Sequence, residues 1–358
     1  MAKSSGSLIS RVTKGGICTF LVFFVILYNE WLAYALRASS WTVIPKSPED
    51  KVVLFAADPQ ILTEEINSNF PYGFITTWDS DRFVQRGLQF AIWKTRPDVV
   101  VFLGDLLDQG SKSTDDEFFS LAKHFKNVMR IPDYVKEIIF VPGDNDIGGE
   151  GSDSVTKHKI QRFFNAFNQS TVTSLDFINF KQVNAMDDSE LSKDLLIQDT
   201  DKDDGKIKVI LSHMPLLPLT SRTIKEKIIK RNPDMIFSAH EHSSFHFVGL
   251  KKDGRANQFG QLKEEDKVWM FNTQEEKLNE IVVPTCSYRM GKSAYGFGSA
   301  VIEKTGRIHY TVLWLPSRFY QLGVYCFISF VVFLLMLPSM FVIIVKFIYA
   351  HVRKYHHL

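Results

Sequence analysis

The chain has 358 residues, of which 45% are hydrophobic and 23% charged, so it can bury a sizeable core and is not intrinsically disordered. Its 42 Lys and Arg residues and 40 Asp and Glu residues leave a net charge of +2, and no basic stripe of the nucleic-acid-binding kind is visible. Three cysteines (Cys18, Cys286 and Cys326) are too few for a disulfide framework.

The N-terminal region contains a long apolar segment. Residues 17–28 carry no charge, and residues 31–36 continue the apolar pattern after Asn29 and Glu30. We predict a cytosolic N-terminus at 1–14 and a transmembrane helix or uncleaved signal anchor at 15–36. A cleavable signal peptide is the alternative, because basic residues precede the segment and Ala33-Tyr34-Ala35 follows it. Either interpretation sends the body of the chain across a membrane.

Five short apolar runs in the body are typical of strands buried on both faces, and each ends in polar side chains. They are 52–57 before Asp58, 99–103 before Gly104-Asp105, 138–141 before Gly143-Asp144, 209–212 before His213, and 235–239 before His240. Stretches with helical character lie between them at 79–94, 114–130 and 222–231, which indicates an α/β fold. Ligand sites of such folds gather beyond the carboxyl ends of the strands, where all five polar clusters fall.

The remainder of the body predicts shorter elements. Segments 268–272, 280–284, 297–303 and 308–313 are expected to be antiparallel strands that complete the sheets, and the charged stretch 198–208 is expected to be a solvated turn. Asn168-Gln169-Ser170 is the only glycosylation sequon, which makes Asn168 the predicted acceptor.

The C-terminal region predicts a second membrane span. Residues 322–345 carry no charge, and we place a transmembrane helix at 320–345 and a cytosolic tail at 346–358. Basic residues flank the outer ends of both apolar segments, so the positive-inside rule puts both termini in the cytosol. The domain at 37–319 is then lumenal or extracellular.

The polar clusters contain the ligand types of a dimetal centre. The expected metal ligands are Asp58, Asp105, His213, His240 and His242, with Asp105 as the residue that bridges two cations. Mixed carboxylate and imidazole ligands suit Mn, Fe or Zn better than Ca or Mg. Gln60 is either a weak ligand or a hydrogen-bonding neighbour of one, and Asp108 and Asp146 are expected to orient ligands and support the site. His246 is expected to be structural rather than a proton donor.

In their order, these motifs resemble those of the calcineurin-like metallophosphoesterase superfamily over about residues 51–315. The resemblance implies a four-layer α/β/β/α sandwich and hydrolysis of phosphoric esters. Asp58-Pro59-Gln60, Asn29-Glu30-Trp31-Leu32 and the two flanking spans further resemble eukaryotic membrane metallophosphoesterases that remodel GPI anchors in the early secretory pathway. That similarity implies removal of ethanolamine phosphate from a GPI mannose with manganese, and so a role in transport of GPI-anchored proteins from the endoplasmic reticulum or Golgi.

The chain departs from the superfamily pattern at the segment Gly143-Asp144-Asn145-Asp146, where Gly-Asn-His-Asp is expected. In direct register, Asp144 replaces a metal-binding Asn, and Asn145 replaces the histidine that protonates the leaving group. A shifted register would instead make Asn145 the metal ligand. Asn cannot titrate, so general-acid help of about 10²–10⁴-fold would be lost.

These observations leave several hypotheses about function. The first is a phosphodiesterase acting on GPI ethanolamine phosphate, in which Glu150 and Glu241 would meet the cationic ethanolamine. The second is a weakly active or inactive trafficking partner that keeps its two metals for structure. A phosphatase of another lipid or nucleotide phosphoester is a third.

Overall fold

The computed structural model describes residues 5–62, 71–186, 205–218, 221–252 and 254–355. The chain divides into two compact units. One consists of residues 37–315, and the other combines residues 1–36 with residues 316–358. Most of the charged stretch 198–208 lies outside the described residues.

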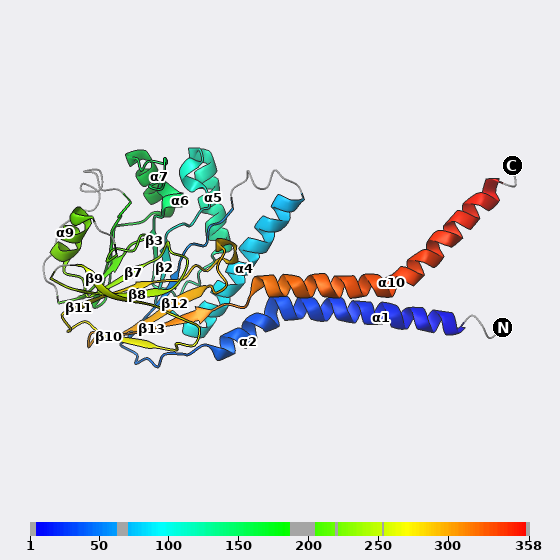
Figure 1. Cartoon of the computed structure of the whole chain (residues 1–358), viewed down its shortest axis with the longest axis horizontal. Helices are drawn as coiled ribbons and strands as arrows, with labels where there is room; N and C mark the ends of the chain where they lie inside the picture. The colour runs from blue at the N-terminus through cyan, green and yellow to red at the C-terminus, as the bar shows by residue number, and fades with distance from the viewer. Residues whose placement is uncertain (1–4, 63–70, 187–204, 219–220, 253, 356–358) are drawn as a thin grey trace. The chain divides into compact units, whose positions relative to one another are not determined.

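The unit at 37–315 contains a six-stranded mixed sheet in the order β10-β13-β12-β1-β2-β3 (Figure 1). Strands β1, β2 and β3 are parallel, and β12 joins the free edge of β1 in the antiparallel sense. The strands span Lys51–Ala56 (β1), Val99–Leu103 (β2), Glu137–Val141 (β3), Trp269–Asn272 (β10), Gly296–Ile302 (β12) and Arg307–Trp314 (β13).

A second sheet has seven strands in the order β4-β5-β6-β7-β11-β8-β9. Its strands span Val172–Leu175 (β4), Ile178–Gln182 (β5), Ile207–Leu211 (β6), Met235–Ser238 (β7), Phe245–Leu250 (β8), Ala256–Gln261 (β9) and Lys277–Val282 (β11). The expectation that the strand near 280–284 is antiparallel is wrong in part. β11 pairs with β7 in parallel and only with β8 in the antiparallel sense, because it fills the gap between them.

The main hydrophobic core lies between the two sheets. Alternate residues of β1, such as Val53 and Phe55, belong to it, and Phe55 stacks on Phe237 of β7 with ring centroids 4.2 Å apart. The intervening residues are also buried, so every residue of β1 is shielded from water. This double burial explains why the parallel strands are continuous apolar runs without alternation.

Helices cover the outer face of each sheet, as the predicted α/β/β/α sandwich requires (Figure 1). Phe125 of α5 packs against Phe102 of β2 and Phe140 of β3, and α4 contacts β1 and β12. On the second sheet, Ile228 of α9 joins a cluster with Ile210 and Ile236. The helices span Tyr72–Thr95 (α4), Asp115–Val128 (α5), Asp144–Ile147 (α6), Lys157–Phe167 (α7) and Arg222–Arg231 (α9), with 3-10 turns at Gly110–Lys112 (η2) and Tyr288–Met290 (η3).

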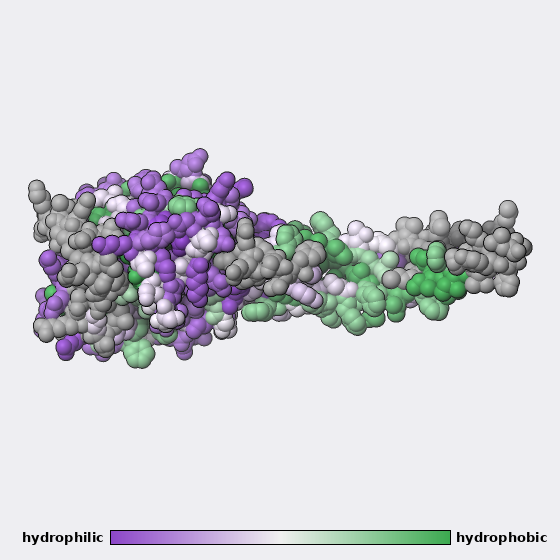
Figure 2. Space-filling model, turned by 90° about the horizontal axis from the view of Figure 1, so that it is seen from above, coloured by the Kyte–Doolittle hydropathy of each residue, from purple (hydrophilic) through white to green (hydrophobic). Residues whose placement is uncertain are grey.

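The second unit is formed by helices from the two ends of the chain. α1 (Ser5–Leu27) continues through a π-helical turn (η1, Tyr28–Leu32) into α2 (Ala33–Ser40), which crosses into the unit at 37–315 from Arg37 onward, and α10 spans Arg318–Tyr355. Segments Lys14–Ser40 and Arg318–Tyr349 are long and apolar enough to cross a membrane by length and composition. Figure 2 shows hydrophobic surface along these helices. Asn29 and Gln321 exchange two side-chain-to-backbone hydrogen bonds of 3.0 Å between α10 and the π-helical turn.

Candidate metal centre

The polar residues that follow the strands adopt an unusual backbone conformation. Asp58 after β1 and Asp105 after β2 have φ angles of 48° and 50°, and His240 and His242 after β7 have 68° and 58°. Left-handed backbone at residues other than glycine is uncommon and is concentrated at functional sites. The local strain turns these side chains toward the same region at the ends of the strands.

Two glycines leave the space that the cluster occupies. Gly104 has a φ angle of 85°, and a Cβ atom there would overlap the His213 imidazole. A Cβ atom at Gly143 would overlap the backbone nitrogen and the carboxylate of Asp105. The glycine of each Gly-Asp motif therefore lets neighbouring ligands approach each other closely.

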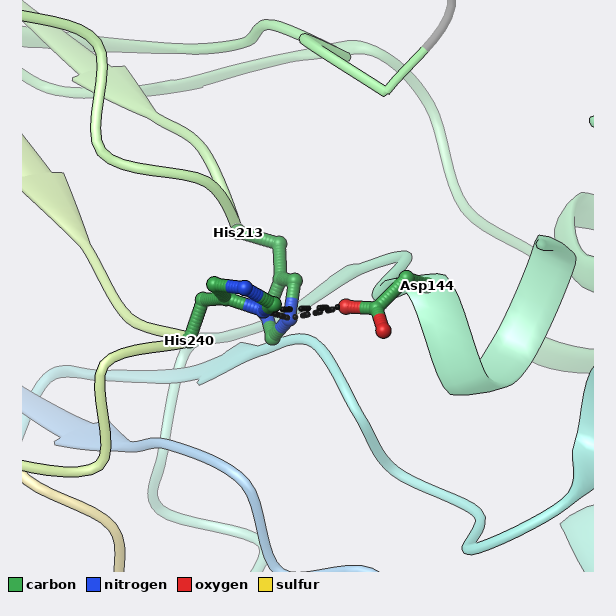
Figure 3. A group of neighbouring side chains, drawn as sticks. All are labelled: Asp144, His213 and His240. Carbon is green, nitrogen blue, oxygen red and sulfur yellow. Dashed lines mark hydrogen bonds and ion pairs between the residues drawn. The ribbon is translucent and has the colours of Figure 1, made fainter. Parts of the chain in front are cut away.

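One group of three candidate ligands consists of Asp144, His213 and His240 (Figure 3). Oδ1 of Asp144 lies 2.9 Å from Nε2 of His213 and 3.1 Å from Nδ1 of His240, and these two nitrogens are 3.3 Å apart. The Nδ1 atom of His213 lies 2.8 Å from the Leu103 carbonyl, which fixes the ring and leaves Nε2 to face the group. Such a bond to the distal nitrogen is the usual support of a metal-binding histidine.

A second group consists of Asp58, Asp105 and His213, so His213 belongs to both. Both carboxylate oxygens of Asp58 are buried and have no hydrogen-bond partner among the described residues. Burial raises the pKa of Asp58 to about 8. A buried carboxylate without partners is costly, and a bound cation would remove that cost. The donor set of the two groups therefore fits two divalent cations.

The histidines at the site differ in the direction in which their pKa values are shifted. Burial opposes protonation of His213, but the neighbouring carboxylates Asp105, Asp144 and Asp58 raise its pKa to about 10. Burial and the charges of His240 and Lys292 lower the pKa of His242 to about 4. A neutral imidazole is the form that binds metal. His242 lies 3.9 Å from Asp58 and falls outside both groups of three.

Asp105 is held by hydrogen bonds from two predicted site residues. The side-chain amide of Gln60 donates to Oδ2 of Asp105 over 3.1 Å. The backbone N–H of Asn145 donates to Oδ1 and its side-chain amide to Oδ2, both over 3.0 Å. In this arrangement Asp144 faces the histidines, while Asn145 orients Asp105.

Asp146 and Asp108 belong to neither group of candidate ligands, but both bond to the loops that carry those ligands. Buried Asp146 accepts hydrogen bonds from the backbone N–H groups of Gly143, Leu106 and Leu107, and so ties together the loops after β2 and β3. Oδ1 of Asp108 lies 3.3 Å from a guanidinium nitrogen of Arg289. Arg289 also donates to the Gln60 carbonyl over 3.0 Å, and sequence reasoning missed it.

The other predicted residues lie apart from the cluster. His246 pairs with Asn279 over 3.0 Å and packs on Phe271, as expected of a structural histidine. Glu150 and Glu241 are exposed, and their proposed contact with ethanolamine stays a prediction. Asn168 is exposed at the C-terminal end of α7.

A family model described as calcineurin-like phosphoesterase matches residues 52–244, which is more than half of the chain and includes every residue of both groups. The chain belongs to this family. Calcineurin-like phosphoesterases are metal-dependent hydrolases with two metal ions, in agreement with the paired groups of candidate ligands.

Curated relatives are similar at modest identity. Metallophosphoesterase 1 of Pongo abelii is 28% identical over 170 residues, which are 47% of this chain and 41% of that protein. Metallophosphoesterase 1 of Danio rerio is 36% identical over 164 residues, 45% of this chain and 40% of that protein. The chain thus spans less than half the length of these relatives. A metallophosphoesterase crystal structure from Sphaerobacter thermophilus superposes with a TM-score of 0.38 at 9% identity, covering 75% of this chain and 89% of that one.

Proposed function

We propose that this protein is a membrane-bound dimetal phosphodiesterase that acts in the lumen of the early secretory pathway. The observation that carries the catalytic part is the pair of partnerless buried oxygens on Asp58, set in a cluster whose two groups share His213. The two apolar helices support membrane attachment, and the domain between them would carry the reaction.

The proposed substrate is the ethanolamine-phosphate diester of a GPI glycan, cleaved with manganese bound. Support comes from the resemblance of Asp58-Pro59-Gln60 and Asn29-Glu30-Trp31-Leu32 to membrane metallophosphoesterases that remodel GPI anchors. Its hydrolysis would aid the transport of GPI-anchored proteins.

The chain's own residues have distinct roles in this proposal. Asp58, Asp105, Asp144, His213 and His240 would hold the two cations. His213 would bind through Nε2 alone, because its Nδ1 faces the Leu103 carbonyl. The expected ligand shared by both cations is the Asp105 carboxylate. Bound cations of this kind lower the pKa of water and neutralise charge on the phosphoryl group. Gln60 and Asn145 fix both oxygens of Asp105, so that the carboxylate keeps its orientation during turnover.

The decisive experiment measures metal content and phosphodiesterase activity of the purified protein beside an Asp105→Asn variant. We expect manganese-supported hydrolysis of bis(4-nitrophenyl) phosphate that falls by at least about 10²-fold in the variant, because the group of Asp58, Asp105 and His213 loses one of its two carboxylates. Asp133→Asn, on the exposed surface before β3, is the matched control and should retain activity.

A second candidate function is a trafficking partner without turnover, which the replacement of the usual histidine by Asn145 favours. Two bound metals per chain without hydrolysis of any phosphoester, including a GPI glycan, would establish this alternative and refute the enzyme.

A further inference from the structure

A cavity of about 390 Å³ lies within the unit at 37–315. Three loops and the end of β13 form its walls. The residues that matter for its chemistry are Ser243, Lys263, Glu264, Lys292, Ser293 and Trp314. None of the candidate metal ligands lines it, so the cavity is distinct from the cluster.

The cavity adjoins the metal centre through two of its walls. Ser243 directly follows His242 in the chain. Lys292 is close enough to His242 for its charge to help lower the pKa of that imidazole. Lys292 also lies in the same loop as Arg289, which bonds to the Gln60 carbonyl. These two links place the cavity next to His242.

Another wall of the cavity, formed by Glu264 and Trp314, is hydrogen-bonded to residues at the start of the unit. The Arg37 guanidinium donates to the Trp314 carbonyl over 3.1 Å and pairs with Glu264. The Trp41 indole donates to the same carbonyl over 2.8 Å. Since Arg37 and Leu315 are the first and last residues of the unit, this wall lies where the chain continues into the apolar helices.

The lining carries uncompensated positive charge and free donors. Glu264 is neutralised by Arg37, whereas Lys263 and Lys292 form no ion pair within the described part of the chain. Trp314 is only 6% exposed, and its indole N–H is buried without a hydrogen-bond partner among the described residues. Two ammonium groups call for an anion, while serine hydroxyls and a partnerless indole N–H suit hydroxyl oxygens.

From these contacts we infer that the cavity binds the part of the substrate that remains after hydrolysis, a sugar that carries a second anionic group. This inference rests on the proposed function, since it assigns one part of the substrate to the cavity and the scissile diester to the metals.

The first test variant is Lys263→Gln, because Lys263, unlike Lys292, does not influence the pKa of a candidate metal ligand. The second is Trp314→Phe, which keeps an aromatic ring and removes the indole N–H. The full-length protein is assayed on ethanolamine-phosphomannose with a second phosphate on the sugar and on bis(4-nitrophenyl) phosphate. We expect Lys263→Gln to lower the ratio of the two kcat/KM values by about tenfold, as for one hydrogen bond from a charged group, and Trp314→Phe to lower it by about threefold, as for one neutral hydrogen bond. Exposed Lys267→Gln is the matched control. An unchanged ratio would overturn the inference.

A binding measurement separates this inference from the proposed function. In the Asp105→Asn background, calorimetry should detect mannose 6-phosphate, with weaker binding after Lys263→Gln and weaker binding of mannose or inorganic phosphate alone. Binding without turnover in the parent protein would refute the enzyme and keep the sugar site. Turnover of the sugar diester with no effect of Lys263→Gln on binding would support the enzyme and refute the sugar site.

Discussion

Asn145 is the residue at which the site differs most from the pattern that the sequence resembles. Its side chain is committed to Asp105, and an amide cannot deliver a proton to a departing alkoxide. The chain therefore supplies orientation at the position where a titrating group would assist bond cleavage.

A histidine at this position tests whether the site lacks a proton donor. We expect Asn145→His to raise kcat on diesters with alkoxide leaving groups by up to about 10²-fold relative to 4-nitrophenyl esters, because nitrophenolate needs no protonation. Loss of the amide bond to Asp105 would lower both classes alike, so the ratio of the two is the readout. Steady-state kinetics on the two substrate classes measure this. Asn145→Ala, which removes the amide without adding an acid, should give no gain on either class, and a gain there would contradict the prediction.

His246 should make stability depend on pH. Burial lowers its pKa from the ordinary 6.5, although the hydrogen bond with Asn279 opposes the shift. The unfolded chain then takes up a proton at a higher pH than the folded chain. The free energy of unfolding is therefore largest above pH 6.5 and falls as the pH drops through the interval down to the folded pKa. Urea titrations of His246→Asn should show a flatter dependence over this interval, and an identical slope would disprove the assignment.

At the scale of secondary structure, the strength of each sequence signal follows the burial of the element. Strands β1, β2, β6 and β7 were predictable because they are buried on both faces, whereas β9 is exposed along its whole length and carries no apolar pattern. The five polar clusters could be predicted because each one directly follows an apolar run that is recognisable as a buried strand. Arg289 could not, because it reaches Gln60 across 229 residues of sequence, a contact that only the tertiary fold creates.

One buried cation helps to attach helix α7, beside the ring contacts of Phe167 with Phe125 and Phe140. Arg162 is 5% exposed, donates to the carbonyls of Gly110 and Ser113, and lies 4.3 Å above the Phe118 ring. We expect Arg162→Met to lower the free energy of unfolding by about 3 kcal/mol, because two carbonyls lose their donor. Chemical denaturation measures the change. The exposed Lys157→Met substitution on the same helix should cost under about 0.5 kcal/mol, and equal effects of the two substitutions would refute the role of Arg162.

The predicted orientation of the chain can be tested at Asn168. This residue is exposed at the end of α7 and lies in the single sequon. If the domain is lumenal, the protein made in cells should carry one endoglycosidase-sensitive glycan, and Asn168→Gln should abolish the mobility shift on a denaturing gel. Asn165→Gln, on the same helix outside the sequon, should retain it. A parent protein without any shift would argue for a cytosolic domain.

The position of β1 has a consequence for how the protein is made. β1 pairs with β2 on one side and with β12 on the other, with Lys51 opposite Ile302. On the ribosome, a nascent chain therefore displays the bare edge of β1 until nearly the entire domain has been synthesised. Chaperones that shield strand edges should stay bound through most of translation, and chains truncated before β12 should be recognised as incomplete and degraded.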